Sequence, residues 1–267
     1  MLEIFQYDFM VRAFIAGFMV AVVAPLIGIF LVIRGYSLMA DTLAHVSLVG
    51  VAISMLAHGD PILIAAATSV IAAFGIEKIR ARGKIFGESV LALFLSGSLA
   101  IASIFISMAR GQNLNVLSYL FGSITTVGKS DLYYIAVLGV IILATFLLIY
   151  RELFYISFDE NLAAANGINT KVYNMILIVL AALTITLSMR IVGILLIGAL
   201  MVIPVIAAMQ FGLSFKKTIG LAIGFSLFSV VSGLYISYWL DLASGGVIVV
   251  MALAIFLGGM LFNRGRS

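Results

Sequence analysis

Residues 10–33, MVRAFIAGFMVAVVAPLIGIFLVI, form an apolar run that holds one charged side chain, Arg12. A helix needs about 20 apolar residues to cross a lipid bilayer. Because lipid offers the backbone no hydrogen-bond partner, such a run is expected to be helical. Further apolar runs lie at residues 42–57, 61–76, 88–109, 132–150, 172–189, 191–211, 218–240 and 244–262. The sequence therefore predicts an all-α integral membrane protein, a polytopic bundle of about eight or nine transmembrane helices.

The composition indicates a surface that faces lipid. Hydrophobic residues make up 64% of the chain and charged residues 10%, whereas a soluble domain has roughly 25% charged residues. So few charges could not cover a water-facing surface. No stretch is long enough for a soluble domain, so residues 1–267 are expected to be a single transmembrane domain. Any domain that hydrolyses ATP or captures a ligand would belong to another chain.

Several functional classes find no support in the residues. The absence of cysteine excludes disulfides and thiolate metal sites. A net charge of +4 gives no indication of a nucleic-acid partner. The sequence has two histidines and no nucleophile–base pattern that would indicate an enzyme. Residues 122–130 resemble a phosphate-binding loop, but five residues separate the glycines where that motif has four, so this chain is not expected to bind ATP.

Lys and Arg predict the orientation, because short cytoplasmic loops carry an excess of both. The connection at 78–84 is the most basic and is expected to be cytoplasmic. Counting spans from it gives an outside N terminus and a cytoplasmic C terminus. The count changes by one if either short run, 42–57 or 61–76, is broken or re-entrant. The predicted cytoplasmic residues are Arg34, Lys78, Arg80, Arg82, Lys84, Arg151, Lys171, Lys216, Lys217, Arg264 and Arg266; Arg12, Arg110, Lys129 and Arg190 fall outside this group.

Asp41 and His45 are the pair with the clearest chemical potential. They are four residues apart, so on a helix both project from one face. A carboxylate and a neutral imidazole are good ligands for a divalent cation such as Zn²⁺, and ionisable groups inside an apolar run tend to line a pathway. The alternative is structural: Asp41 caps a helix start and His45 bonds a carbonyl group at the interface. Spacing alone does not decide between the two.

Two other polar positions are interpreted structurally. His58 and Asp60 precede Pro61 in what is expected to be a tight turn, where Asp is common. Arg190 lies between two apolar runs and is expected to extend its guanidinium to the membrane interface.

Residues 157–171, SFDENLAAANGINTK, form a polar insert between two apolar runs. Asp159 or Asn161 could begin a short helix and Gly167 could end it. Such a helix would lie along the membrane face and dock onto a partner domain. The alternative, a solvated loop, is favoured by the pattern alone.

Four blocks of the sequence are similar to one known family along nearly the whole chain. The sequence resembles the permease subunits of the zinc/manganese/iron ABC importers. The blocks are RGYSLMADTLAHVSLVGVA (34–52), LSYLFGSI (117–124), FDENLAAANGI (158–168) and VGILLIGALMVIPVIAA (192–208). The resemblance implies a homodimer in the cell membrane, paired with two ATP-binding cassette ATPase subunits and supplied by an extracellular metal-binding protein.

The resemblance also implies roles for individual residues. Asp41 and His45 match the family's metal pair on the translocation path, which favours the metal hypothesis over capping. Asp159, Ala163 and Gly167 match its cytoplasmic segment that couples to the ATPase, which favours the short helix.

The transported metal would be cargo, and no resident cofactor is expected. Residues 37–48 are closer to the zinc branch than to the manganese branch, which favours zinc. The alternatives are a manganese or iron importer of this family, or a stand-alone proton-coupled carrier that uses His45 and an acidic residue such as Glu88.

Overall fold

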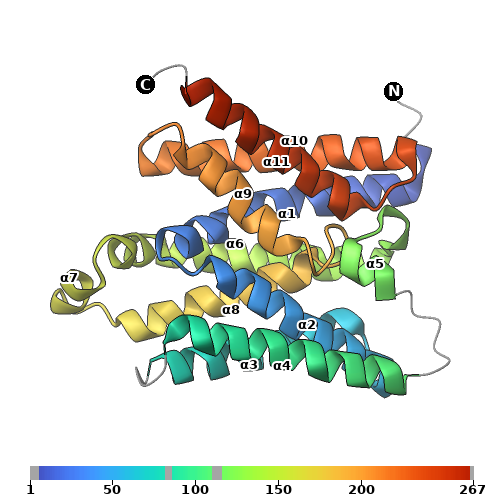
Figure 1. The fold of residues 1–267 in the computed structure, drawn as a ribbon, viewed down its shortest axis with the longest axis horizontal. Coiled ribbons are helices and arrows are strands. Elements are labelled where there is room, and N and C mark those ends of the chain that lie inside the picture. Colours follow the sequence, from blue (N-terminus) through green and yellow to red (C-terminus); the bar gives the residue numbers. More distant parts are fainter. Residues whose placement is uncertain (1–5, 82–85, 110–115, 265–267) are drawn as a thin grey trace.

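The computed structural model describes residues 6–81, 86–109 and 116–264. Eight helices in these ranges are long and apolar enough to cross a membrane, which confirms the predicted all-α membrane fold (Figure 1). They are α1 (Asp8–Ile33), α2 (Ser37–Ala57), α3 (Pro61–Arg80), α4 (Gly87–Met108), α6 (Lys129–Phe158), α8 (Thr170–Ser188), α10 (Phe215–Leu240) and α11 (Ser244–Arg264). Four shorter elements lie between them: α5 (Val116–Phe121), the 3₁₀ helix η2 (Ile124–Thr126), α7 (Glu160–Ala165) and α9 (Ile197–Met209).

The run 191–211 does not form the full span expected of it. Its helix, α9, has 13 residues, and a helix of that length is about 20 Å long, shorter than the hydrocarbon core of a bilayer. The preceding residues turn instead, with Gly193 at φ +87°. There the backbone N–H groups of Ile194 and Leu195 donate to the carbonyls of Tyr119 and Leu120 in α5, at 2.8 and 3.1 Å. A contact with a distant segment thus replaces the first turns of the expected helix.

The two short runs are continuous helices, because each extends beyond its apolar part. Helix α2 begins at Ser37 and has 21 residues, and α3 continues to Arg80 and has 20. The turn before α3 is as predicted. The backbone of His58 adopts the left-handed conformation, and the carboxylate of Asp60 caps α3 by accepting hydrogen bonds from the N–H groups of Ile62 and Leu63.

Those predicted cytoplasmic basic residues that the structure describes lie at the end of the bundle that carries α7, called the α7 end below (Figure 1). Arg34 follows α1, Arg80 ends α3, and Lys216 and Lys217 begin α10. At the opposite end, called the α5 end, Lys129 begins α6. That the α7 end faces the cytoplasm stays a prediction. Arg82, Lys84, Arg110 and Arg266 lie outside the described residues.

Helix α1 is the centre of the bundle and packs against α6, α8, α9 and α10. Its contact with α9 depends on Gly28, where an added Cβ would lie 1.9 Å from the carbonyl oxygen of Met201. The contact between α2 and α3 likewise uses Gly50, where a Cβ would lie 2.4 Å from Cα of Ala65. Small residues at such crossings allow membrane helices to pack backbone against backbone.

Candidate metal pathway

A three-residue turn sets where α2 begins. Gly35 adopts φ +70°. The N–H of Gly35 donates to the carbonyl of Val32 at 3.1 Å, and that of Tyr36 donates to Leu31 at 2.7 Å. This pair of bonds is the Schellman arrangement that ends a helix at a glycine. The next helix therefore begins at Ser37, with Tyr36 as its N-cap. Asp41 lies more than one turn inside α2, so the hypothesis that it caps the helix is wrong.

Asp41 and His45 lie on the one face of α2 that its neighbours leave open. Leu38 is exposed, and Asp41, His45 and Val49 are partly exposed. These four residues, spaced three or four apart, are called the open stripe below. The residues between them are buried: Met39, Ala40, Thr42, Leu43, Ala44, Val46, Ser47 and Leu48. The structure thus places the two candidate ligands together on an accessible face inside an apolar bundle.

The carboxylate of Asp41 lies directly against α9. A Cβ built on Gly198 would be 1.9 Å from Oδ1 of Asp41 and 3.1 Å from its Cγ. Only a residue without a side chain leaves room for the carboxylate in this position. Gly198 was not singled out from the sequence, although it belongs to the similar block 192–208, because nothing in the chain shows that α9 meets α2.

Neither candidate ligand has a hydrogen-bond partner within the described part of the chain, although the two groups interact electrostatically with each other. The imidazole Nδ1 of His45 is buried without a hydrogen bond, so the alternative in which it bonds a carbonyl through this atom is not supported. No hydrogen bond or ion pair of Asp41 is present among the described residues either. A polar group inside the membrane is costly unless something satisfies it. A bound cation would satisfy both.

The described residues hold no group of three or more His, Cys, Asp or Glu side chains that could close around a metal ion. Glu88, the acidic residue of the proton-carrier alternative, is exposed in the first turn of α4. The described part of one chain therefore brings two ligands together where a closed zinc site has four. Such an incomplete set can hold an ion briefly and release it.

The segment 157–171 contains the short helix that the resemblance implied, and the solvated loop favoured by its pattern alone is wrong. Asp159 is the N-cap of α7, and its carboxylate accepts from the N–H of Leu162 at 2.9 Å. Gly167 ends the helix at φ +83°: its N–H donates to Ala164. Ala163 is buried. Asp159 thus caps the start of the helix, Ala163 packs it against the protein, and Gly167 turns the chain away after its end.

Helix α7 is tied to two other helices by one carboxylate. Oε2 of Glu160 lies 3.3 Å from Nη2 of Arg34, the residue after α1, and Oε1 accepts from Nδ2 of Asn174 in α8 at 2.8 Å. Sequence reasoning missed Glu160 and Asn174 as functional candidates. Glu160 lies inside the similar block 158–168, but its partner is 126 positions away.

Arg190 does not extend to the interface as expected. Its Nη2 lies 3.4 Å from Oδ1 of Asp131, with the two side chains 17% and 6% exposed, and its guanidinium lies 4.5 Å from the ring centre of Tyr119. Burial raises the pKa of the Tyr119 hydroxyl above its ordinary value. Through Tyr119 and the Gly193 turn, the similar blocks 117–124 and 192–208 meet at the α5 end.

Comparison with known proteins identifies the family. The model of the ABC 3 transport family matches residues 6–263. The "Probable metal transport system membrane protein" of Treponema pallidum is 36% identical, over 94% of each chain. The "Manganese transport system membrane protein MntC" of Listeria monocytogenes is 33% identical, over 96% of this chain and 91% of the relative. The "High-affinity zinc uptake system membrane protein ZnuB" of Haemophilus influenzae is 28% identical, over 98% and 100%.

A solved structure agrees with the sequence relatives. "PsaBC from Streptococcus pneumoniae in complex with Fab" contains a chain that is 32% identical, with a TM-score of 0.86 over 97% of this chain and 92% of that one. This chain is a multi-pass membrane protein that belongs to the ABC 3 transport family.

Proposed function

We propose that this chain is the membrane-spanning permease of an ATP-driven importer, and that the ion it moves into the cytoplasm is zinc, held in transit by Asp41 and His45. The observation that carries the proposal is the open stripe of α2. It presents a carboxylate and an imidazole, neither with a hydrogen-bond partner among the described residues, inside a bundle whose core is mostly apolar. Relatives named for metal transport support the same class of cargo.

The two ligands suit a transported ion better than a resident one. A carboxylate and a neutral imidazole both accept Zn²⁺. Desolvation of an unpartnered carboxylate inside a membrane favours capture of a cation that would neutralise it. With two ligands from one chain, release on the far side stays possible.

A homodimer would complete the site. The open stripe is partly accessible from outside the chain, so a second copy could oppose it beside α9 and supply another carboxylate and another imidazole. Two copies then offer four ligands, the number of a tetrahedral zinc site. An extracellular metal-binding protein would deliver the ion between the copies.

Helix α7 is the proposed contact with the ATPase subunits. It lies at the end of the bundle that is predicted to face the cytoplasm, and the side chain of Leu162 on its surface is 61% exposed. An exposed apolar side chain on a short, firmly capped helix suits docking into a groove of a partner. Movement of α7 would reach α1 and α8 through Glu160.

Manganese is the second candidate, because the relative named for manganese is 33% identical and the one named for zinc 28%. Both metals accept carboxylate and imidazole ligands. The preference for zinc rests on the resemblance of residues 37–48.

The test is metal uptake into proteoliposomes that hold this chain with its ATPase, with ATP on the ATPase side. We expect ATP-dependent zinc uptake that Asp41→Ala and His45→Ala abolish and that the matched histidine control His58→Ala retains. Faster manganese than zinc uptake would change the metal and leave the class intact. Uptake that needs no ATP and is lost in Glu88→Gln would contradict the importer and support the proton-coupled carrier.

A further inference from the structure

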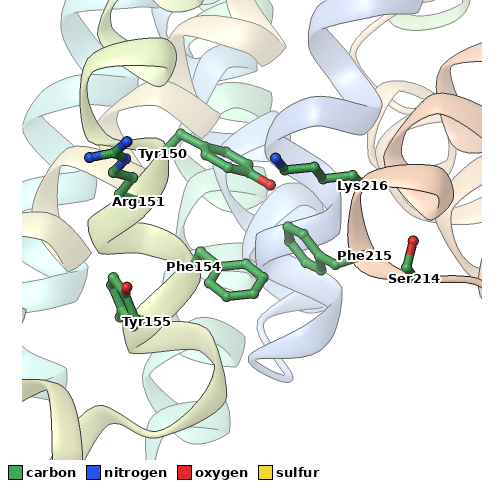
Figure 2. Close-up of a pocket in the computed structure, with 7 residues that line it drawn as sticks. All are labelled: Tyr150, Arg151, Phe154, Tyr155, Ser214, Phe215 and Lys216. Carbon is green, nitrogen blue, oxygen red and sulfur yellow. The ribbon is translucent and has the colours of Figure 1, made fainter.

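A cavity of about 670 Å³ opens at the α7 end, between the last turns of α6 and the start of α10. Tyr150 and Phe154 reach from α6 toward Phe215 and Lys216 of α10, and the Tyr150 hydroxyl and the Lys216 ammonium group point toward each other (Figure 2). Arg151 and Tyr155 line the α6 side and Ser214 the α10 side. The cavity thus combines aromatic walls with cations from two helices.

The charged side chains that line this cavity are all positive among the described residues. None of the described residues that line it is acidic, and neither Arg151 nor Lys216 forms an ion pair within the described ranges. The start of α10 adds to the positive potential. Ser214 is its N-cap but makes no side-chain capping bond, and the free N–H groups of a helix start attract anions. The site therefore favours an anion such as a phosphate group.

An apolar surface continues directly from the cavity. Leu147 and Leu148 precede Arg151 by one helical turn, so all three lie on one face of α6. These leucines are 74% and 80% exposed, in a helix apolar enough to span the membrane. A ligand with its phosphate in the cavity can lay hydrocarbon along both leucines. Exposed leucines beside a basic cavity favour a phospholipid over a soluble phosphate, which has no hydrocarbon to place there.

We propose that this cavity binds the headgroup phosphate of an anionic phospholipid from the leaflet at the α7 end, with acyl chains against Leu147 and Leu148. Lys216 holds the phosphate beside the Tyr150 hydroxyl, and Arg151, whose side chain lies on the other side of Tyr150 (Figure 2), adds a second positive charge on the α6 side of the cavity. The hydroxyls of Tyr150 and Ser214 donate hydrogen bonds to its oxygens or to the glycerol. Basic pockets between membrane helices bind anionic headgroups by this chemistry. The inference is independent of which metal the protein moves.

The test is lipid titration of the full-length chain, purified in a non-ionic detergent and followed by native mass spectrometry. The probes are phosphatidylglycerol, phosphatidylcholine with the same acyl chains, and inorganic phosphate. The double variant Arg151→Gln/Lys216→Gln removes the two cations. Lys171→Gln/Lys217→Gln is the matched control, because it removes two exposed cations at the same end that do not line the cavity.

We expect phosphatidylglycerol to bind at least about tenfold more weakly to the double variant, since each cation contributes about 1 kcal/mol near a membrane surface. The control variant should keep the wild-type affinity for phosphatidylglycerol. It should also keep the wild-type preference for phosphatidylglycerol over phosphatidylcholine. If the double variant is unstable, Lys216→Gln alone should show a smaller loss of the same sign. Equal binding of both lipids, or displacement of phosphatidylglycerol by millimolar inorganic phosphate, would overturn the proposal. Unchanged lipid affinity with lost ATPase association would instead make the cavity a protein-docking surface.

Discussion

Arg34 and Glu160 are 126 positions apart in the sequence, yet Nη2 of Arg34 lies 3.3 Å from Oε2 of Glu160. Glu160 is the first residue of α7, and Arg34 begins the turn that leads into α2. The guanidinium is almost fully buried, whereas the carboxylate is half-exposed. One ion pair therefore joins the proposed ATPase contact to the helix that carries the proposed metal ligands.

Glu160→Gln tests this connection. The amide can still accept from Asn174, but it loses the charge that faces Arg34. A half-exposed ion pair contributes at most about 1 kcal/mol to stability, so unfolding should change little. ATP-dependent metal uptake should fall about fivefold or more, which is the change that a typical coupling free energy between two sites produces. Glu88→Gln, which removes an exposed carboxylate in the first turn of α4, is the control and should leave uptake unchanged.

Gly167→Trp tests the docking role of α7. Gly167 has φ +83° and an added Cβ there meets nothing within 4 Å, so the substitution strains the backbone by about 1–2 kcal/mol without a clash at its Cβ. Uptake and ATPase association should both fall sharply. Gly212→Trp is the matched control, since Gly212 has φ +60° and equally open surroundings. Equal losses in both variants would show that strain, and not docking, is responsible.

Gly198→Ala tests the position of the Asp41 carboxylate. The added methyl group would occupy the space of Oδ1, so the side chain must rotate away. We expect metal affinity, measured by equilibrium dialysis of the purified chain, to fall about tenfold, or about 1.4 kcal/mol. Gly97→Ala, which meets nothing within 4 Å, should keep full affinity. Unchanged affinity in Gly198→Ala would mean that Asp41 does not act from this position.

Asp131→Asn tests the buried pair at the α5 end. The amide can still accept the bond that Gly128 donates to this side chain, but Arg190 loses its counter-charge. A hydrogen bond to a charged group contributes about 1.5–3 kcal/mol, so the thermal unfolding midpoint should drop by several degrees. Lys129→Gln at the exposed start of α6 should not shift it. A midpoint equal to that of the wild type would contradict this prediction, because it would mean that water and not Asp131 solvates the Arg190 guanidinium.

The helices that hydropathy predicts are those whose formation depends on local sequence. Lipid requires a long apolar run to satisfy its own backbone, so eight of the nine runs are full helices. The ninth is not, because Gly193 lets its first residues bond to α5, and no local pattern reveals that contact. The grouping of Arg34, Arg80 and Lys216 at one end was also predictable, because it follows from the distribution of charged residues along the sequence.

The candidate site was predictable in part. Asp41 and His45 share a face because helical spacing requires it, and α7 lies between its N-cap Asp159 and the left-handed Gly167 because both residue types have local roles. The partners of these residues, Gly198 beside Asp41 and Arg34 beside the first residue of α7, come from other helices. Such contacts depend on how the helices cross, which a single sequence does not reveal.

The proposed role of Asp41 and His45 is to hold the transported ion between two copies of the chain. Its most direct test is zinc binding to the purified full-length chain, with the bound metal and the protein both quantified after equilibrium dialysis. We expect about one zinc ion per two chains, in keeping with four ligands around one ion, and loss of that ion in both Asp41→Asn and His45→Gln. One ion per two chains that survives both substitutions would place the metal elsewhere.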